Sequence, residues 1–544
     1  MPALFRALLT LACLFLALPV LGVLSAWFTL DASAWANLRH QWHTVLPGYA
    51  TQSLLLAAGV GLGVMVLGSG LAAIVTLFDF PGRRLWEWAL LMPLAMPAYV
   101  LAYAWTDALQ FSGAVQSGLR QLLGVQGALW GDVRSLPGAT LLFVLCLYPY
   151  VYLLVRAALG ERAVRLMEAA RLLGAPMGRR VLEVALPMAR PAVAAGTALA
   201  LMETLADYGV GSYFGLTTFS TGIYKAWLVQ GDRVAAAQLA ALLLLLVAVL
   251  LAAERHAQRR LRFSVAGHGV SAPEARPLRL RGAAGWALAA LCSLPVLLGF
   301  VLPVAWLMHL LVQEARYAEL GLPLARFAHW AANSFRLAGS AALAATALAL
   351  AVAFALRRGE GRVLPLAARV LSLGYAVPGA VVALGLLAPL AWAQERWPGT
   401  GVAAWVTGTA VGLMLAYLVR FSAVALQSVE AGYARLPLAV DETARLLGGN
   451  GRRVFFELHL PLLKRSALAA ALLVFVDVMK ELPATLVLRP FGSDTLAVVA
   501  YNLARDERLA EAALPSLAIV AVGLLPVILL SRALRAPASS QADG

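Results

Sequence analysis

Long apolar runs alternate with short polar connections along almost all of this 544-residue chain. Each run has the roughly 20 residues that an α-helix needs to cross the hydrocarbon of a bilayer. The pattern therefore predicts twelve membrane-spanning helices. They are placed at about 8–28, 53–78, 88–110, 137–156, 190–212, 235–253, 286–312, 334–356, 365–391, 401–424, 466–488 and 512–531.

The composition agrees with this pattern. Hydrophobic residues make up 61% of the chain and charged residues 13%, and the mean hydropathy is +0.80. Soluble domains are about 45–50% apolar and about 25% charged, so a set of soluble domains is excluded. The three cysteines, Cys13, Cys146 and Cys292, lie inside apolar runs with a spacing that suits neither a metal site nor a disulfide framework. The predicted fold class is an all-α polytopic membrane protein.

The net charge of +15 reflects the connections between the apolar runs rather than one basic domain. If the amino terminus is inside, 30 of the 43 Lys and Arg residues fall in the connections on that same side. Lys and Arg are retained on the cytoplasmic side of bacterial membrane proteins. The distribution therefore predicts that both termini are cytoplasmic, and it argues against a nucleic-acid partner.

An internal repeat is the most informative feature of the sequence. Residues 168–187 (EAARLLGAPMGRRVLEVALP) and 442–461 (ETARLLGGNGRRVFFELHLP) are identical at ten of twenty positions. Weaker pairs continue the repeat, among them Ser53 with Ser334 and Pro97 with Pro378. Six spans per copy is an even number, so the copies have the same orientation in the membrane, and parallel repeats of this kind enclose a pathway between them.

The repeat divides the chain into two halves joined by a basic linker. The first half is 1–253, with a core at about 50–253 and a repeated loop at 161–189. The linker, 254–284, is predicted to be cytoplasmic. The second half is 285–544, with a core at about 330–531 and a repeated loop at 435–465.

The repeated segment is too polar to span the membrane, and both copies fall on the cytoplasmic side. Apolar residues at helical spacing predict two short amphipathic helices in each copy, separated by glycine-containing turns. Gly174 and Gly448 lie where the chain must turn, so a side chain there is expected to clash or to require an unfavourable backbone. Glu168 and Glu442 are expected to hold the loop, for example through Arg171 or Arg445.

These residues resemble the cytoplasmic coupling loop of ABC-importer permeases, whose pattern is EAA, three residues, Gly, nine residues, an aliphatic residue, any residue and Leu-Pro. The first copy matches at Glu168, Ala169, Ala170, Gly174, Val184, Leu186 and Pro187. The second matches at Glu442, Ala444, Gly448, Leu458, Leu460 and Pro461, and departs at Thr443. The resemblance implies that each loop inserts a short helix into a separate ATPase subunit.

The same resemblance implies the partners and the mechanism. Two copies of a cytoplasmic ATPase would bind the loops, and a periplasmic solute-binding protein would deliver the substrate for alternating access across the lipid bilayer. ATP and Mg would be bound by the ATPase and no cofactor by this chain. The absence of a G-x-x-x-x-G-K-[ST] loop agrees with a chain that is not itself an enzyme.

Other stretches are similar to the fused ferric-iron permeases, from about residue 50 to 530. They are MPLAMPAYVLAYAWTD, METLADYGVGSYFG and STGIYKAW in the first half, and KELPATLVLRPF and DTLAVVAY in the second. Iron is the substrate that this likeness implies, and thiamine or another small solute is the alternative within the class. Outside the class, the alternatives are a proton-coupled secondary transporter with twelve helices, suggested by DFPGRR at 79–84, and a membrane enzyme.

Ionisable residues at the end of the fifth span of each half are candidates for the pathway. Such groups are costly within a membrane and usually face a cavity or a partner. The candidates are Glu203, Asp207, Asp477, Lys480 and Glu481, together with Tyr208. They either line the pathway, where oxygen atoms suit Fe(III), or form structural pairs, for example Lys480 with a carboxylate. A tight metal site is not expected, because it would trap the ion.

Overall fold

The computed structural model of the chain describes residues 3–25, 32–159, 170–259, 278–280, 282–317, 321–359 and 361–535. Regular structure in these residues is helical apart from two strands of two residues each, β1 (Phe78–Asp79) and β2 (Leu278–Arg279). The strands pair in parallel, with Phe78 opposite Leu278. The all-α fold predicted from the sequence is confirmed.

The described residues form two compact units, and each unit is built from several separate stretches of the sequence. The first-repeat unit consists of 42–221, 245–321 and 503–544, and the second-repeat unit consists of 1–41, 222–244 and 322–502. Each unit thus combines the core of one repeat with segments from the other half. The linker 254–284 lies between the two repeats in the sequence, but it does not separate the two units, because all of it falls in the first-repeat unit. Its residues 260–277 and 281 lie outside the described residues.

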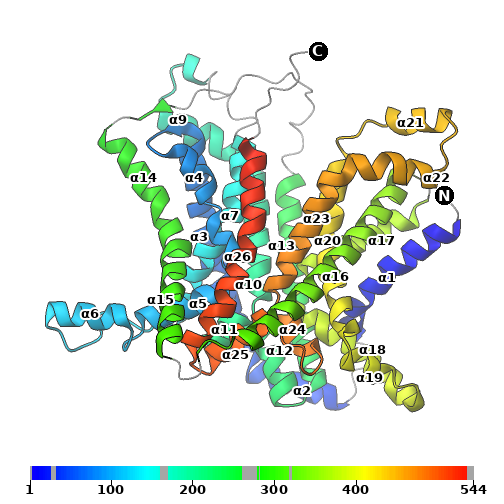
Figure 1. Cartoon of the computed structure of the whole chain (residues 1–544), viewed down its shortest axis with the longest axis horizontal. Helices are drawn as coiled ribbons and strands as arrows, with labels where there is room; N and C mark the ends of the chain where they lie inside the picture. Colours follow the sequence, from blue (N-terminus) through cyan, green and yellow to red (C-terminus); the bar gives the residue numbers. More distant parts are fainter. Residues whose placement is uncertain are drawn as a thin grey trace. The chain divides into compact units, whose positions relative to one another are not determined.

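Helices make up nearly all of the described first-repeat unit, and most of them are labelled in Figure 1. They are α3 (Leu46–Leu77), α4 (Arg83–Ala89), η1 (Met92–Ala95), α5 (Ala98–Leu109), α6 (Ala114–Leu123), α7 (Leu136–Ala158), α9 (Met177–Arg180), η3 (Val181–Ala185), α10 (Leu186–Ala206), α11 (Gly209–Tyr213), α14 (Ala283–Val296), η6 (Leu297–Val301), α15 (Leu302–Tyr317) and α26 (Leu509–Arg535).

The second-repeat unit is built in the same way around its own core. Its helices are α1 (Ala3–Ser25), η4 (Lys225–Val229), α16 (Leu324–Arg357), α17 (Val363–Ser372), η7 (Gly374–Ala376), α18 (Gly379–Arg396), η8 (Pro398–Thr400), α19 (Val402–Gly408), α20 (Ala410–Tyr433), α21 (Ala439–Leu446), α22 (Gly451–Arg453), η9 (Val454–His459), α23 (Leu460–Lys480) and α24 (Pro483–Leu488). Four helices cross a unit boundary: α2 (Ala32–His43), α12 (Phe219–Tyr224), α13 (Arg233–Arg259) and α25 (Leu496–Arg505).

Nine helices in the described residues are long and apolar enough to cross a membrane, or up to eleven if each of two bent pairs counts as one span. The bent pairs occupy the predicted spans 88–110 and 365–391. The predicted count of twelve is not confirmed. The remaining predicted span, 466–488, corresponds to α23, where Lys464, Arg465 and Asp477 lie close to the two ends of the apolar stretch.

The two bends fall at Pro97 and Pro378, which are equivalent positions of the repeat. The residues before them, Met96 and Val377, have extended backbones, as residues before proline prefer. A new helix, α5 or α18, starts directly after each proline, and the bends measure 91° and 118°. One sequence feature therefore produces the same broken span in both repeats.

Small residues allow the spans of the first-repeat unit to pack closely. α3 and α10 both pack against α7. A Cβ atom added at Gly68 of α3 would lie 2.7 Å from Val151, and one added at Gly196 of α10 would lie 2.6 Å from the backbone of the same residue. Small residues at helix crossings are typical of membrane bundles, where close packing must supply the association energy.

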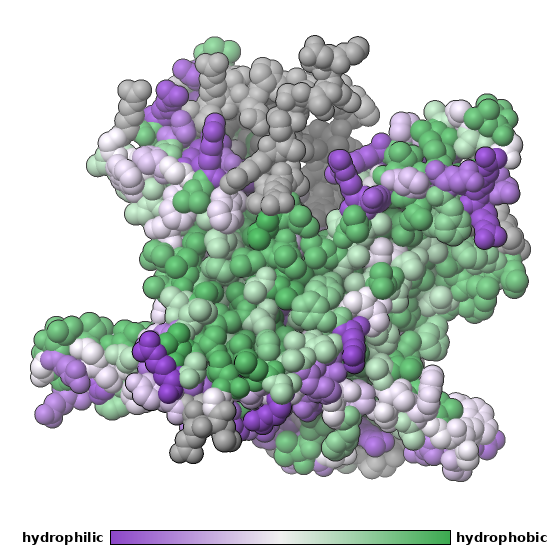
Figure 2. All heavy atoms as spheres, in the orientation of Figure 1, coloured by the Kyte–Doolittle hydropathy of each residue, from purple (hydrophilic) through white to green (hydrophobic). Residues whose placement is uncertain are grey.

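The surface of the spans matches a membrane environment. Many large hydrophobic side chains are exposed, including Leu54, Leu62 and Val66 on α3 and Leu343 on α16. Figure 2 shows hydrophobic residues over the middle of the spans and hydrophilic residues toward their ends. In each unit, the repeated loop lies at one end of the spans: α9 at the end of the first-repeat unit, and α21 and α22 at the end of the second, where α1 also begins (Figure 1).

Candidate functional site

The second repeated loop joins α20 to α23 and contains α21. At the end of α21, Gly448 has a left-handed backbone with φ +75°, and the Gly449 N–H donates to the Ala444 carbonyl over 2.9 Å. This is the Schellman ending of a helix, which satisfies a carbonyl that the helix leaves free. The Asn450 side chain then accepts a hydrogen bond from the N–H of Arg453 and begins α22.

The first repeated loop makes the same turn. Gly174 has φ +81°, its N–H donates to the Arg171 carbonyl, and the Ala175 N–H donates to the Ala170 carbonyl, both over 3.0 Å. Glu168 and Ala169 lie outside the described residues. The predicted clash is absent at both glycines, because a Cβ added at Gly174 or Gly448 would meet no atom within 4 Å. The requirement for glycine there is one of backbone conformation.

After the turn, each loop joins its span without a separate second helix. A π-helical turn, η3 or η9, runs directly into α10 or α23. Leu186 and Pro187 begin α10, and Leu460 and Pro461 begin α23. Proline within a helix lacks an N–H and crowds the preceding turn, and the wider π turn before each proline accommodates both defects. The predicted second amphipathic helix is thus continuous with the fifth span.

Each loop exposes a pair of leucines just before its glycine turn. Leu172 and Leu173 are 89% and 88% exposed, and Leu446 and Leu447 are 89% and 82% exposed. These four are among the most exposed large hydrophobic side chains in the described residues. Each loop thus presents an equivalent apolar tip outside the spans.

Each loop carries an exposed ion pair at equivalent positions of the repeat. The ion pair Arg179–Glu183, at 3.1 Å, recurs as Arg453–Glu457 at 2.7 Å, and both are exposed. Glu442 is exposed. Its pairing with Arg445 stays a prediction, because the side chain of Arg445 lies outside the description.

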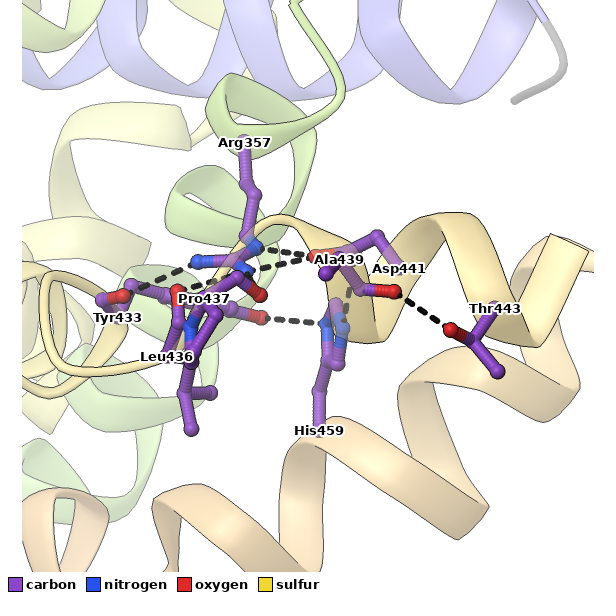
Figure 3. Close-up of polar contacts among 8 residues, drawn as sticks. All are labelled: Arg357, Tyr433, Leu436, Pro437, Ala439, Asp441, Thr443 and His459. Atoms are coloured by element: carbon purple, nitrogen blue, oxygen red, sulfur yellow. Dashed lines mark hydrogen bonds and ion pairs between the residues drawn. The ribbon is translucent and has the colours of Figure 1, made fainter.

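A buried polar cluster at the base of the second loop was not predicted from the sequence (Figure 3). Arg357, the last residue of α16, contacts Asp441 of α21 with Nε at 2.7 Å and Nη2 at 2.6 Å. The same guanidinium donates to the backbone carbonyls of Tyr433, Leu436 and Pro437, each over 3.0 Å. These carbonyls lie at and just beyond the end of α20, where a helix leaves carbonyls free.

His459 completes this cluster from the end of η9. Its Nε2 lies 2.9 Å from Oδ1 of Asp441, and its Nδ1 lies 3.1 Å from the Tyr433 hydroxyl. A neutral ring with its proton on Nε2 suits both contacts, because Tyr433 can then donate to Nδ1. Burial lowers the pKa of His459, the positive charges of Arg357 and Arg358 lower it further, and Asp441 opposes this shift.

The cluster could have been suspected from differences between the two copies. At the offsets of the repeat, Asp441, His459, Tyr433 and Arg357 correspond to Met167, Ala185, Leu159 and Thr76. Three of these first-copy residues are apolar and the fourth is a threonine, and charged residues are unusual at buried positions. Identities between the copies do not reveal the cluster, because its residues differ between them.

The pathway candidates include one carboxylate with a clear structural role. Glu481 lies at the extended break between α23 and α24 and is 4% exposed. Its Oε1 accepts from Arg420 over 3.2 Å and from the Ala484 N–H over 2.9 Å, and its Oε2 accepts from the Thr485 N–H over 2.9 Å. Glu481 therefore forms a buried ion pair with Arg420 of α20.

The remaining candidates lie in the last turns of α10 and α23 or directly after α10, and they are less buried than Glu481. Asp207 ends α10, and its Oδ1 accepts from the Val210 N–H over 2.8 Å, which caps α11 as Glu481 caps α24. Glu203, Tyr208, Asp477 and Lys480 are partly exposed in the described structure. Their place along a pathway stays a prediction. No group of three or more His, Cys, Asp or Glu residues in the described ranges is arranged to hold a metal ion.

Comparison with known proteins agrees with this geometry. Residues 64–263, which contain the first repeated loop, match the family model described as "Binding-protein-dependent transport system inner membrane component". The match covers 200 of the 544 residues, and the chain is a multi-pass inner-membrane permease of the binding-protein-dependent ABC importer type.

Two relatives show the range of this class. The chain is 25% identical over 483 residues to the Fe(3+)-transport system permease protein FbpB 2 of Haemophilus influenzae, which covers 89% of each chain. It is 28% identical over 169 residues to the molybdenum transport system permease protein ModB of Escherichia coli, which covers 31% of this chain and 69% of ModB. The longer match extends across both repeats, as the internal repeat predicts for a fused permease.

Proposed function

We propose that this chain is the membrane subunit of an ATP-driven importer and docks two copies of a cytoplasmic ATPase, one on each repeated loop. The observation that carries the proposal is one exposed structural arrangement that occurs in both loops. It consists of a helix end, two exposed leucines and a glycine with a left-handed backbone. Leu172 and Gly174 in the first loop have the same geometry as Leu446 and Gly448 in the second. A two-fold pair of ATPases needs two such surfaces.

The rest of the assembly follows from the transport class. A periplasmic solute-binding protein delivers substrate to the outer ends of the spans, and alternating access carries it inward. ATP and Mg are bound by the ATPase, and this chain holds no cofactor of its own. Both termini are cytoplasmic, so a reporter fused after Gly267 is expected on the cytoplasmic side and one near Gly231 on the periplasmic side.

Ferric iron is the substrate that we propose. The proposal is supported by the likeness to FbpB 2 over 89% of each chain and by the iron-permease stretches of the sequence. The matching ModB is named for molybdenum, so the class alone does not select the metal. Uptake of radioactive Fe(III) in competition with thiamine and molybdate tests this assignment. Uptake of one of the competitors in place of Fe(III) would overturn it.

Docking itself is tested by photo-crosslinking. A photoreactive residue at Leu172 or Leu446 is expected to crosslink to the co-expressed ATPase. Leu122 of α6 is a matched control, because it is 84% exposed and lies at the opposite end of the first-repeat unit (Figure 1). Crosslinking at Leu122 but not at the two loops would contradict the proposal.

A further inference from the structure

The polar cluster of Arg357, Asp441, His459 and Tyr433 joins four elements at one point. Arg357 ends α16, Tyr433 ends α20, Asp441 lies in α21, and His459 leads into α23. The side chains of Arg357 and Asp441 are only 9% and 11% exposed. A buried ion pair of this kind is costly to break, because removal of one partner leaves a charge without compensation. The loop is therefore fixed to three spans at once.

The first loop has no comparable attachment in its described residues. Thr76, Leu159 and Ala185, which correspond to Arg357, Tyr433 and His459, carry no charge. Within 170–187, no ion pair between described residues reaches a span, since Arg179–Glu183 lies inside the loop segment.

Charged residues near the first loop tie other elements together. Glu87 of α4 lies 3.3 Å from both Arg83 and Arg156, the latter in the last turn of α7. The Arg83 side chain also donates to the Val75 carbonyl of α3 over 2.7 Å. This network connects α3, α4 and α7 and includes no residue of 170–187.

We infer that Arg357, Asp441 and His459 are positioning residues that make the second loop the stiffer coupling element of the permease. The inference rests on the proposed function, in which both loops receive the movement of an ATPase. Movement at the second loop passes directly to α16, α20 and α23, whereas movement of the described part of the first loop, 170–189, passes along η3 into α10. The two ATPase sites then do unequal work although their docking surfaces have the same geometry.

The first test measures loop stiffness in the permease without its ATPase. Spin labels are placed singly at Leu172 and Leu446, which are equally exposed at 89% each, so differences in exposure do not decide the result. The label at Leu446 is expected to be the less mobile, and Asp441→Asn should raise its mobility without changing the label at Leu172. Equal mobility at both positions in the unmodified permease would overturn the inference.

The second test measures coupling in the reconstituted transporter. The triple variant Arg357→Thr, Asp441→Met and His459→Ala places first-loop residue types in the second loop and leaves no buried charge without a partner. Uptake per ATP hydrolysed is expected to fall about tenfold, a size typical of lost coupling between sites. ATPase binding and hydrolysis should stay within about twofold of the unmodified protein.

The matched control is Thr76→Val, which changes the position equivalent to Arg357 and removes a hydroxyl that has no hydrogen-bond partner among the described atoms. It should not change the coupling ratio. Normal coupling in a triple variant that folds and binds the ATPase would overturn the inference. An unmodified permease that neither binds the ATPase nor transports with ATP would instead overturn the proposed function, and the stiffness measurement would still report on the cluster.

Discussion

The Nε2 atom of His459 lies 2.9 Å from Oδ1 of Asp441 at the point where the second loop enters α23. Burial and the charges of Arg357 and Arg358 lower the pKa of this histidine from its ordinary value of 6.5. The folded protein therefore holds the imidazole neutral at a pH where the unfolded chain already binds a proton. Between the two pKa values the unfolded state binds more protons, so the free energy of unfolding falls as pH falls.

We expect acid to destabilise the second-repeat unit through this residue. The loss should begin as pH falls through 6.5 and be complete below the folded-state pKa. Thermal unfolding of the purified permease between pH 7.5 and 5, compared with His459→Ala, measures it. The variant should lose less stability than the unmodified protein over this range. Parallel pH profiles would show that His459 does not contribute.

The glycine turns should tolerate no side chain, although space is available. Alanine in the left-handed region costs about 1–2 kcal/mol, so Gly174→Ala with Gly448→Ala should distort both loops and leave the spans folded. We expect normal insertion, weaker ATPase binding and a large loss of uptake. Gly178→Ala is the control, because Gly178 lies in helix α9 without a positive φ and an added Cβ meets nothing within 4 Å. Equal effects at Gly174 and Gly178 would rule out the conformational explanation.

Glu481 should behave as a structural residue. Glu481→Ala leaves the Arg420 charge and the Ala484 and Thr485 N–H groups without their carboxylate, and removal of one partner of a buried pair costs about 3–5 kcal/mol. We expect a marked loss of folded protein, measured by thermal unfolding in detergent. The double variant Glu481→Gln with Arg420→Met should recover much of that loss. A stable Glu481→Ala variant that inserts normally but does not transport would assign the residue to the pathway.

The repeat predicts equal effects at Ser53 and Ser334. The Ser53 hydroxyl accepts from the Phe219 N–H over 3.0 Å, and the Ser334 hydroxyl accepts from the Leu496 N–H over 2.8 Å, both buried. Each alanine variant leaves a buried backbone N–H without a partner and should cost about 1–3 kcal/mol. Thermal unfolding of the two single variants tests this. A loss at one serine only would mean that the repeat is not energetically symmetric.

Much of the architecture follows from local signals in the sequence. Apolar length predicts most spans, Pro97 and Pro378 account for the two bends, and Gly174 and Gly448 mark the turns of the loops. These features act within a few residues of one another, so pattern alone identifies them.

The set of segments that makes up each compact unit depends on contacts between residues far apart in the sequence, so it could not be predicted. α1 packs against α17 and α18, which lie more than 300 residues later in the chain. The polar cluster is similar, because Arg357 and Asp441 come from separate helices and only the fold brings them together. The periodicity of a single sequence does not show which residues from distant helices are in contact.

Energy coupling is the central claim, and uptake into proteoliposomes tests it most directly. The permease, its ATPase and the solute-binding protein are reconstituted with ATP on the side of the repeated loops, and the proton gradient is collapsed with an ionophore. The account predicts uptake that requires both ATP and the ATPase and continues without the gradient. Uptake that follows the proton gradient and needs no ATPase would contradict it and identify a secondary transporter.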